Sequence, residues 1–147
     1  RGPDRVPKLI ARFEDVIRDV GDASTMVIGG KSMGGRIASM IADDVGVAGC
    51  LCLGYPFHPR VDPDRLRTAH LETLRTPTLI VQGTRHTFGT REEVEGYALS
   101  DAIELAWMED GDHSFKPRKK SGRTLEQNLE TAIEASFEFI ARCAPAR

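Results

Sequence analysis

The sequence predicts an α/β fold in which helices cover both faces of a doubly wound, mostly parallel sheet. Segments with helical apolar spacing alternate with short apolar strand segments along the whole chain. The strand segments are apolar throughout, which is typical of parallel strands buried on both faces. Loops rich in glycine, proline or charge follow them, and in such folds the functional groups lie in loops after the carboxyl ends of strands.

The composition fits one globular domain that spans residues 1–147. Hydrophobic residues make up 40% of the chain and charged residues 29%, a balance that allows a buried core. The formal net charge of −2 provides no basic field for nucleic acid or anionic lipid. No apolar run is long enough to span a bilayer. We therefore expect neither a nucleic acid nor a membrane as a partner.

Two helices and two strands are predicted in the first half of the chain. Apolar residues at helical spacing predict a helix over 6–20, which ends at Gly21 and Asp22. Residues 25–28 form a short buried strand. Helical spacing returns over 32–43, and 47–53 is a continuous apolar strand.

The second half begins with a proline- and charge-rich stretch, 54–76. Apolar runs then predict two more strands, and helical spacing predicts the segments that flank them. The predicted elements are a short helical piece at 64–71, a strand at 78–82, a short helix at 91–98, a strand at 103–108, a polar loop at 109–122 and a closing helix at 124–142.

The three cysteines, Cys50, Cys52 and Cys143, show no metal-type spacing. Cys50 and Cys52 fall on one predicted strand, and we expect their side chains on opposite faces, with no bridge between them. Three reduced thiols fit a cytoplasmic protein.

Residues 30–34 read Gly-Lys-Ser-Met-Gly and match the G-x-S-x-G pattern between a buried strand and an amphipathic helix. Such a turn holds a nucleophilic serine in a strained conformation, here Ser32. We expect glycine at Gly30 and Gly34 because side chains there would collide with the neighbouring backbone. The amide of Met33 would point at an oxyanion. The alternative is an ordinary N-cap serine, or a loop that cradles a phosphate.

A serine hydroxyl needs a base, and His113 is the best candidate. It follows the fourth strand in the segment Gly-Asp-His-Ser-Phe, 111–115, so the chain order has the serine first and the histidine last. The alternative is a histidine in a surface loop with no catalytic part.

The carboxylate that should orient the histidine is not evident. The loop after the third strand holds His86 and contains no Asp or Glu before Glu92. Asp62 and Asp64, after the second strand, are the other candidates for this acid. Asp110 and Asp112 are close to His113 in sequence, which hinders an approach to its ring.

Two further segments have two interpretations each. Residues 55–59, which include His58, form either a wall of a substrate cleft or a rigid proline-rich connection. The basic run 116–120 is either a solvated loop or a local site for an acidic group.

Four blocks of the chain, 28–36, 52–59, 77–85 and 111–115, together resemble one family. It is the group of small bacterial alpha/beta-hydrolase-like proteins akin to dienelactone hydrolase and to the hydrolase-like domain of a eukaryotic chromatin-complex subunit. The resemblance runs from about residue 6 to residue 140. It implies an alpha/beta-hydrolase fold and a serine hydrolase of the esterase type, with Ser32 as nucleophile, His113 as base and no metal or organic cofactor.

The chain departs from the family pattern in two places. The family has Asp directly after the Gly-Thr-Arg run, where this chain has His86. The family also has further strands before the helix at 6–20, and one of their loops supplies a second oxyanion donor. The chain then corresponds to the C-terminal portion of the full fold. We expect the strand before Ser32 to lie at a sheet edge, and self-association through that edge or poor stability to follow.

These observations predict a hydrolase that acts on a small-molecule acyl ester or a related carbonyl substrate through Ser32 and His113. The alternative is a catalytically impaired protein on a hydrolase fold that serves as a binding or scaffold module.

Overall fold

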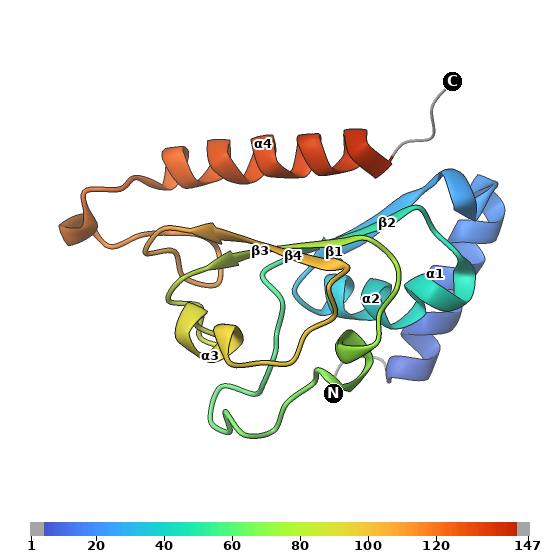
Figure 1. Cartoon of the computed structure of the whole chain (residues 1–147), viewed down its shortest axis with the longest axis horizontal. Helices are drawn as coiled ribbons and strands as arrows, with labels where there is room; N and C mark the ends of the chain where they lie inside the picture. Colours follow the sequence, from blue (N-terminus) through green and yellow to red (C-terminus); the bar gives the residue numbers. More distant parts are fainter. Residues whose placement is uncertain (1–4, 144–147) are drawn as a thin grey trace.

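A computed structural model, in which residues 5–143 are described, contains one sheet of four parallel strands in the order β1-β2-β3-β4 (Figure 1). The strands are Val27–Lys31 (β1), Gly49–Leu53 (β2), Thr78–Gly83 (β3) and Ile103–Met108 (β4). The helices are Val6–Val20 (α1), Met33–Val45 (α2), Arg91–Glu95 (α3) and Leu125–Cys143 (α4). Helix α4 covers one face of the sheet, and the other helices lie toward the opposite face. The predicted α/β fold with helices on both faces is confirmed.

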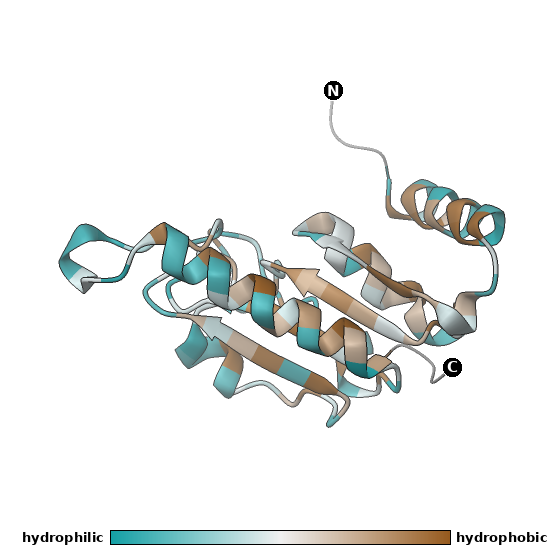
Figure 2. Ribbon diagram, turned by 90° about the horizontal axis from the view of Figure 1, so that it is seen from above, coloured by the Kyte–Doolittle hydropathy of each residue, from teal (hydrophilic) through white to brown (hydrophobic). Residues whose placement is uncertain are grey.

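The core forms two layers, one on each face of the sheet. Toward α1 and α2, the core contains Ile28, Ile41, Cys50 and Ile80 among others, and toward α4 it contains Leu79, Val81 and Phe139. Every residue of β3 is buried, as its central position predicts. Figure 2 shows the strands as largely apolar ribbons beside α4. The continuous apolar runs in the sequence therefore reflect strands that are covered on both faces.

The register of the strands brings their carboxyl ends to one edge of the sheet. Lys31 lies opposite Leu53, Leu53 opposite Val81, and Gly83 opposite Met108. The loops that follow these strands begin at residues 32, 54, 84 and 109, so they meet at the same end of the molecule. This arrangement brings together residues that lie far apart in the sequence.

Several predicted boundaries shift for local reasons. The strand predicted from residue 25 begins at Val27, because Ala23–Thr25 forms a 3₁₀ turn whose Ser24 amide donates to Asp22 at 2.9 Å. The helical piece predicted at 64–71 is reduced to the 3₁₀ turn Ala69–Glu72. The short helix α3 ends at Glu95, just before Gly96.

The prediction that Cys50 and Cys52 face opposite ways is wrong. Residues two apart on a strand share a face because the side-chain period is two. Both thiols are fully buried on the same face of β2, with their sulfur atoms 3.9 Å apart. All three cysteines are free.

Strand β1 ends the sheet on one side and pairs only with β2 within the described residues. A groove lined mostly by apolar residues lies beside this edge, between β1, β2 and Ile140 of α4. A second groove lies between β2 and α4, and the exposed side chains of Ile133 and Phe137 line it. Self-association through this edge stays a prediction.

Within residues 5–143, no helix combines the length and apolarity needed to cross a membrane.

Candidate active site

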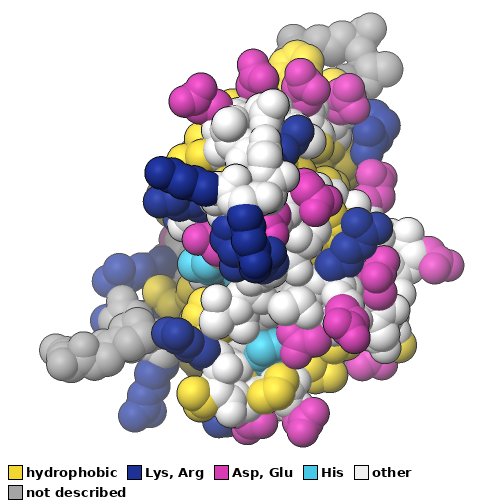
Figure 3. All heavy atoms as spheres, turned by 90° about the vertical axis from the view of Figure 1, so that its left-hand side faces the viewer, with side chains coloured by type: hydrophobic (Ala, Val, Ile, Leu, Met, Phe, Trp, Pro, Cys, Tyr) yellow, Lys and Arg dark blue, Asp and Glu magenta, His cyan; other side chains and the backbone are white. Residues whose placement is uncertain are grey.

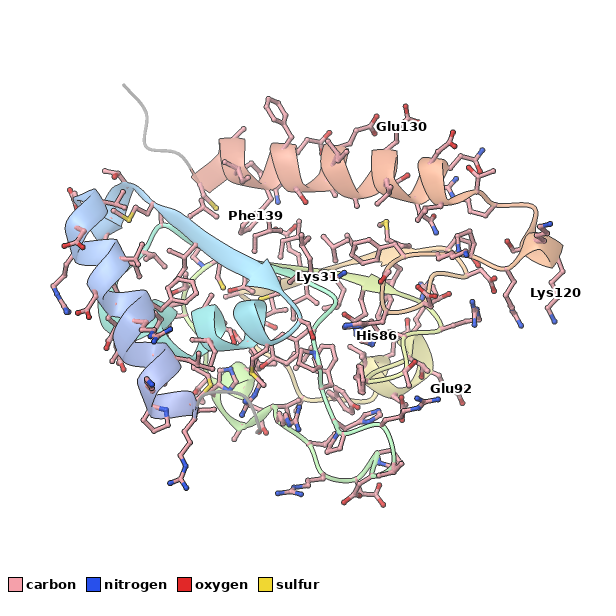
Figure 4. All side chains as sticks on the ribbon, turned by 180° about the vertical axis from the view of Figure 1, so that it is seen from behind. Lys31, His86, Glu92, Lys120, Glu130 and Phe139 are labelled. Atoms are coloured by element: carbon pink, nitrogen blue, oxygen red, sulfur yellow. The ribbon has the colours of Figure 1, made fainter. Side chains whose placement is uncertain are left out.

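The carboxyl ends of three strands bring together Ser32 after β1, His86 after β3 and His113 after β4. Figure 4 shows Lys31, next to Ser32, and His86 at the same end of the sheet, whereas Phe139 lies under α4 away from them. The charge of Lys31 acts on the imidazole of His113, which places the elbow within electrostatic reach of that ring.

Ser32 occupies a sharp turn between β1 and α2. Its φ of 53° and ψ of −118° lie outside the regions that side-chain-bearing residues prefer. The turn is fixed at both sides, because the Ser32 amide donates to the Leu53 carbonyl at 2.8 Å and the Ser32 carbonyl accepts from the Arg36 amide at 3.1 Å. Such strain, held by the surrounding backbone, is typical of a nucleophile elbow.

The first turn of α2 leaves donors for an anion. The hydrogen bond that Arg36 donates to Ser32 closes the first helical turn, so the amides of Met33, Gly34 and Gly35 precede it and have no acceptor in their own helix. The Met33 amide directly follows Ser32. In a nucleophile elbow, the amide of the residue after the serine is one of the oxyanion donors, and Met33 has that position in the chain.

The predicted steric need for glycine holds at Gly30 and is wrong at Gly34. A Cβ on Gly30 would lie 2.8 Å from the Gly34 carbonyl carbon, whereas a Cβ on Gly34 would meet no atom within 4 Å. The second close approach is at Gly35, whose Cβ would lie 2.7 Å from the Gly30 carbonyl oxygen. The reason is that the Gly35 position of α2 faces β1 and β2, and the Gly34 position faces away from them.

The imidazoles of His86 and His113 form a direct pair. Nε2 of His86 lies 2.6 Å from Nδ1 of His113, and the ring centroids are 4.6 Å apart at an interplanar angle of 79°. The ring of Phe88 packs edge-to-face on His113 at 5.3 Å. His86 thus occupies the position that a carboxylate takes beside the base of a serine hydrolase triad.

Gly54 links this pair to the elbow. A Cβ at Gly54 would lie 3.3 Å from Nε2 of His86 and 3.5 Å from Nδ1 of His113, so its backbone packs directly against both rings. The residue before it, Leu53, accepts the hydrogen bond from Ser32. The β2 carboxyl end therefore touches both Ser32 and the histidine pair. Gly54 also has a φ of 68°, which glycine adopts without strain.

Both imidazoles are held in the neutral form. Burial and the neighbouring His113 lower the pKa of His86 to about 4, and the His86 side chain is 0% exposed. Burial and the charge of Lys31 also lower the pKa of His113, against an opposing effect of Asp112. The pair is therefore uncharged at neutral pH.

The low pKa of His86 predicts that stability falls in mild acid. An imidazole with a folded pKa of about 4 and an unfolded pKa of 6.5 binds fewer protons in the folded state between these values. Stability is thus complete above pH 6.5 and is lost as the pH falls. At ~1.4 kcal/mol per pH unit, we expect a loss of about 2 kcal/mol between pH 6.5 and about pH 5.

Denaturant unfolding at both pH values measures this loss, with His86→Asn as the control. The asparagine side chain would keep an acceptor for the Phe88 amide and cannot titrate. The acid-induced loss is expected to be smaller in the variant by about the same ~2 kcal/mol. Equal losses in both proteins would show that His86 is not the group that titrates.

The other acid candidates do not reach His113. Asp62 and Asp64 are exposed in the loop after β2, and neither carboxylate has a hydrogen bond to a histidine among the described residues. The Asp112 carboxylate accepts from the Ser114 and Lys116 amides at 2.8 and 3.0 Å.

Figure 3 shows the end of the molecule with the strand carboxyl ends, where basic and acidic side chains are interspersed.

Asp110 fixes the loop that carries His113. Its carboxylate accepts from the Arg118 guanidinium at 2.6 and 3.1 Å and from the Arg118 amide at 2.8 Å. These hydrogen bonds hold the pKa of Asp110 well below its usual range. Arg85 lies 3.2 Å from the same carboxylate, which ties this loop to the loop that carries His86. Arg118, one residue of the basic run 116–120, is therefore paired with Asp110.

Gln82, which the sequence pattern did not single out, fixes two of the loops. Its fully buried side chain accepts from the Tyr55 amide at 2.7 Å and donates to the Tyr55 and Gly89 carbonyls at 3.0 and 3.1 Å. It therefore joins the loop after β2 to the loop that carries His86. The signal for it was a polar residue at the end of an otherwise apolar strand.

His58 belongs to the rigid connection rather than to a cleft wall. It is only 2% exposed, and Tyr55 and Phe57 beside it are fully buried. Its Nδ1 donates to the Pro59 carbonyl at 2.8 Å and its Nε2 to Glu93 at 3.1 Å. Burial opposes a charge on this ring, but the Pro59 carbonyl and Glu93 outweigh it and raise the pKa of His58.

Comparison with known proteins identifies the family and the fold. The profile of a family described as alpha/beta hydrolase domain matches residues 1–141. An alpha-beta serine hydrolase homologue from Coxiella burnetii superposes with a TM-score of 0.66 at 21% identity, covering 91% of this chain and 62% of that one. A lidless a/b serine hydrolase from Xanthomonas campestris gives a TM-score of 0.70 at 16% identity, with 100% and 62% coverage.

A monoacylglycerol lipase from Paleococcus ferrophilus has a TM-score of 0.69 at 11% identity, over 96% of this chain and 77% of the lipase. At these identities the superpositions establish the fold. The chain spans 62% of the length of the Coxiella and Xanthomonas proteins.

Proposed function

Because this chain belongs to the alpha/beta-hydrolase domain family, we propose that it hydrolyses an acyl ester or a related carbonyl substrate with Ser32 as nucleophile and His113 as base. The observation that carries the proposal is the strained elbow at Ser32. Its φ of 53° is retained at the carboxyl end of β1, beside the N-terminus of α2 and near His113. A serine that served only as an N-cap would accept a hydrogen bond from the first helical turn, and Ser32 accepts none.

The proposed reaction follows from these positions. Ser32 Oγ attacks the carbonyl carbon and transfers its proton to Nε2 of His113. The Met33 amide donates to the tetrahedral oxyanion. When the intermediate collapses, the bond to the leaving alkoxide breaks and His113 returns the proton to that oxygen. Water then attacks the acyl group on Ser32 in the same way, which releases the acid and restores the serine.

A fluorophosphonate probe tests the nucleophile. Prolonged treatment is expected to label Ser32, since its Oγ forms a bond to phosphorus and fluoride leaves. Intact mass and peptide mapping detect the adduct, and Ser32→Ala should remain unlabelled. Ser39→Ala is the matched control on the same helix, because the Ser39 hydroxyl already donates to the Arg36 carbonyl at 2.7 Å. That variant should be labelled as the wild type is.

The rival candidate is a binding or scaffold module on a hydrolase fold. The observation that favours it is the imidazole of His86 in the place of a carboxylate next to His113. A Ser32 that stays unlabelled both in the wild type and in a folded His86→Asp variant would overturn the hydrolase proposal and favour this rival.

A further inference from the structure

The protonation of His86 is set by a backbone amide. The Phe88 N–H donates to Nδ1 of His86 at 3.0 Å. A backbone amide N–H can only donate a hydrogen bond, so Nδ1 of His86 must be unprotonated to accept it. In the neutral ring, the proton of His86 is then on Nε2.

The proton on Nε2 of His86 in turn decides the state of His113. Nε2 lies 2.6 Å from Nδ1 of His113, and two N–H groups cannot face each other at that distance. Since His86 supplies the proton, Nδ1 of His113 accepts it.

A neutral His113 that accepts at Nδ1 carries its own proton on Nε2. A general base needs the opposite arrangement, with the proton on Nδ1 and a lone pair on Nε2 for the serine proton. We propose that His86 is a positioning residue that holds His113 in the Nε2-protonated tautomer and thereby withholds the base from Ser32. The consequence for Ser32 rests on the proposed function, whereas the tautomer itself does not.

The surroundings of the pair support this resting state. The charge of Asp112 acts on His113, but its carboxylate accepts from the Ser114 and Lys116 amides rather than from His113. Lys31 places a positive charge near His113 and opposes an imidazolium there. For His113 to become a base, its proton must be on Nδ1, where it faces Nε2 of His86. The proton of His86 must then move from Nε2 to Nδ1 of the same ring, which breaks the hydrogen bond from the Phe88 amide. The pair therefore has two proton arrangements, and the backbone favours the inactive one.

Nitrogen-15 NMR of the imidazoles tests the proposal directly. With ¹⁵N-histidine label at pH 8, two-bond correlation spectra show which ring nitrogen carries the proton. We expect Nε2 in both His86 and His113. The chain has only 4 histidines, so single substitutions assign them. His58 provides an internal reference, because its nitrogens contact the Pro59 carbonyl and the Glu93 carboxylate and not another imidazole. A proton on Nδ1 of His113 in the wild type would overturn the proposal.

Variants extend the test. In His86→Asp a carboxylate replaces the donor, so the proton of His113 should move to Nδ1; an unchanged tautomer in the folded variant also contradicts the proposal. His70→Gln is the control, because His70 bonds Ser39 at 2.8 Å outside the pair, and its spectrum should retain Nε2-protonated His113. If His86→Asp does not fold, the wild-type spectrum alone decides.

The outcome is separable from the proposed function. The tautomer is read without substrate, and the same spectrum is expected from Ser32→Ala. A correct tautomer with an unreactive Ser32 would leave this inference standing and remove the hydrolase. A reactive Ser32 with Nδ1-protonated His113 would overturn this inference and leave the proposed hydrolase activity standing.

Discussion

Replacing His86 with Asp is expected to raise ester turnover by up to about 10⁴-fold, the factor lost when a triad Asp becomes Asn in a serine protease. That loss arises because the base is held in the wrong tautomer, which is the state we infer for His113. In the wild type, His86 contacts the Phe88 amide and Nδ1 of His113. A carboxylate at residue 86 would offer only acceptors to these two groups, so it would favour a proton on Nδ1 of His113. It also offsets the charge of Lys31 when His113 becomes an imidazolium.

The measurement is the initial rate on an activated short-chain ester, with wild type, His86→Asp and His86→Asn compared in one assay. Asn has nearly the size of Asp but no charge, so His86→Asn should stay within about tenfold of wild type. Adding Ser32→Ala to His86→Asp should abolish the gain, which excludes hydrolysis by another group. A folded His86→Asp protein with no gain would mean that the missing charge does not limit the reaction.

His86 also shows where sequence reasoning about the site ends. The pattern around Ser32 and the position of His113 after the fourth strand are local, so both were found in the sequence. The absence of a carboxylate after Gly-Thr-Arg was equally visible. The tautomer was not, because it depends on the Phe88 amide, a backbone contact that exists only once the loop has folded.

The fold was predictable for a related reason. Apolar runs and helical spacing reflect burial, and they gave the four parallel strands and the long helices with small boundary shifts. The loops were harder, because polar side chains hold them across the chain. Gln82 joins loops that begin about 30 residues apart, and Asp110 joins its own loop to the one that carries His86. No spacing of residues in the sequence indicates either of these two contacts.

The largest expected effect on stability concerns the glycines of the elbow. Gly35→Ala is expected to destabilise the chain by roughly 3 kcal/mol or more, because its Cβ would lie 2.7 Å from the Gly30 carbonyl oxygen and 3.1 Å from Cys52 Cα. Neither neighbour moves easily, since Gly30 is in β1 and Cys52 in β2. Gly30→Ala should behave in the same way, as its Cβ would meet the backbone of Gly34 at 2.8 Å.

Gly34→Ala is the matched control, and its expected effect has the opposite sign. A Cβ there meets nothing within 4 Å, and alanine restricts the unfolded chain more than glycine does. Stability should therefore stay unchanged or rise by up to about 1 kcal/mol. Urea unfolding of the three variants measures the contrast, and labelling of Ser32 in Gly34→Ala checks that the elbow is intact. If Gly34→Ala proved as damaging as Gly35→Ala, the second glycine of the G-x-S-x-G pattern would be needed for a contact other than the packing of α2 on β1 and β2.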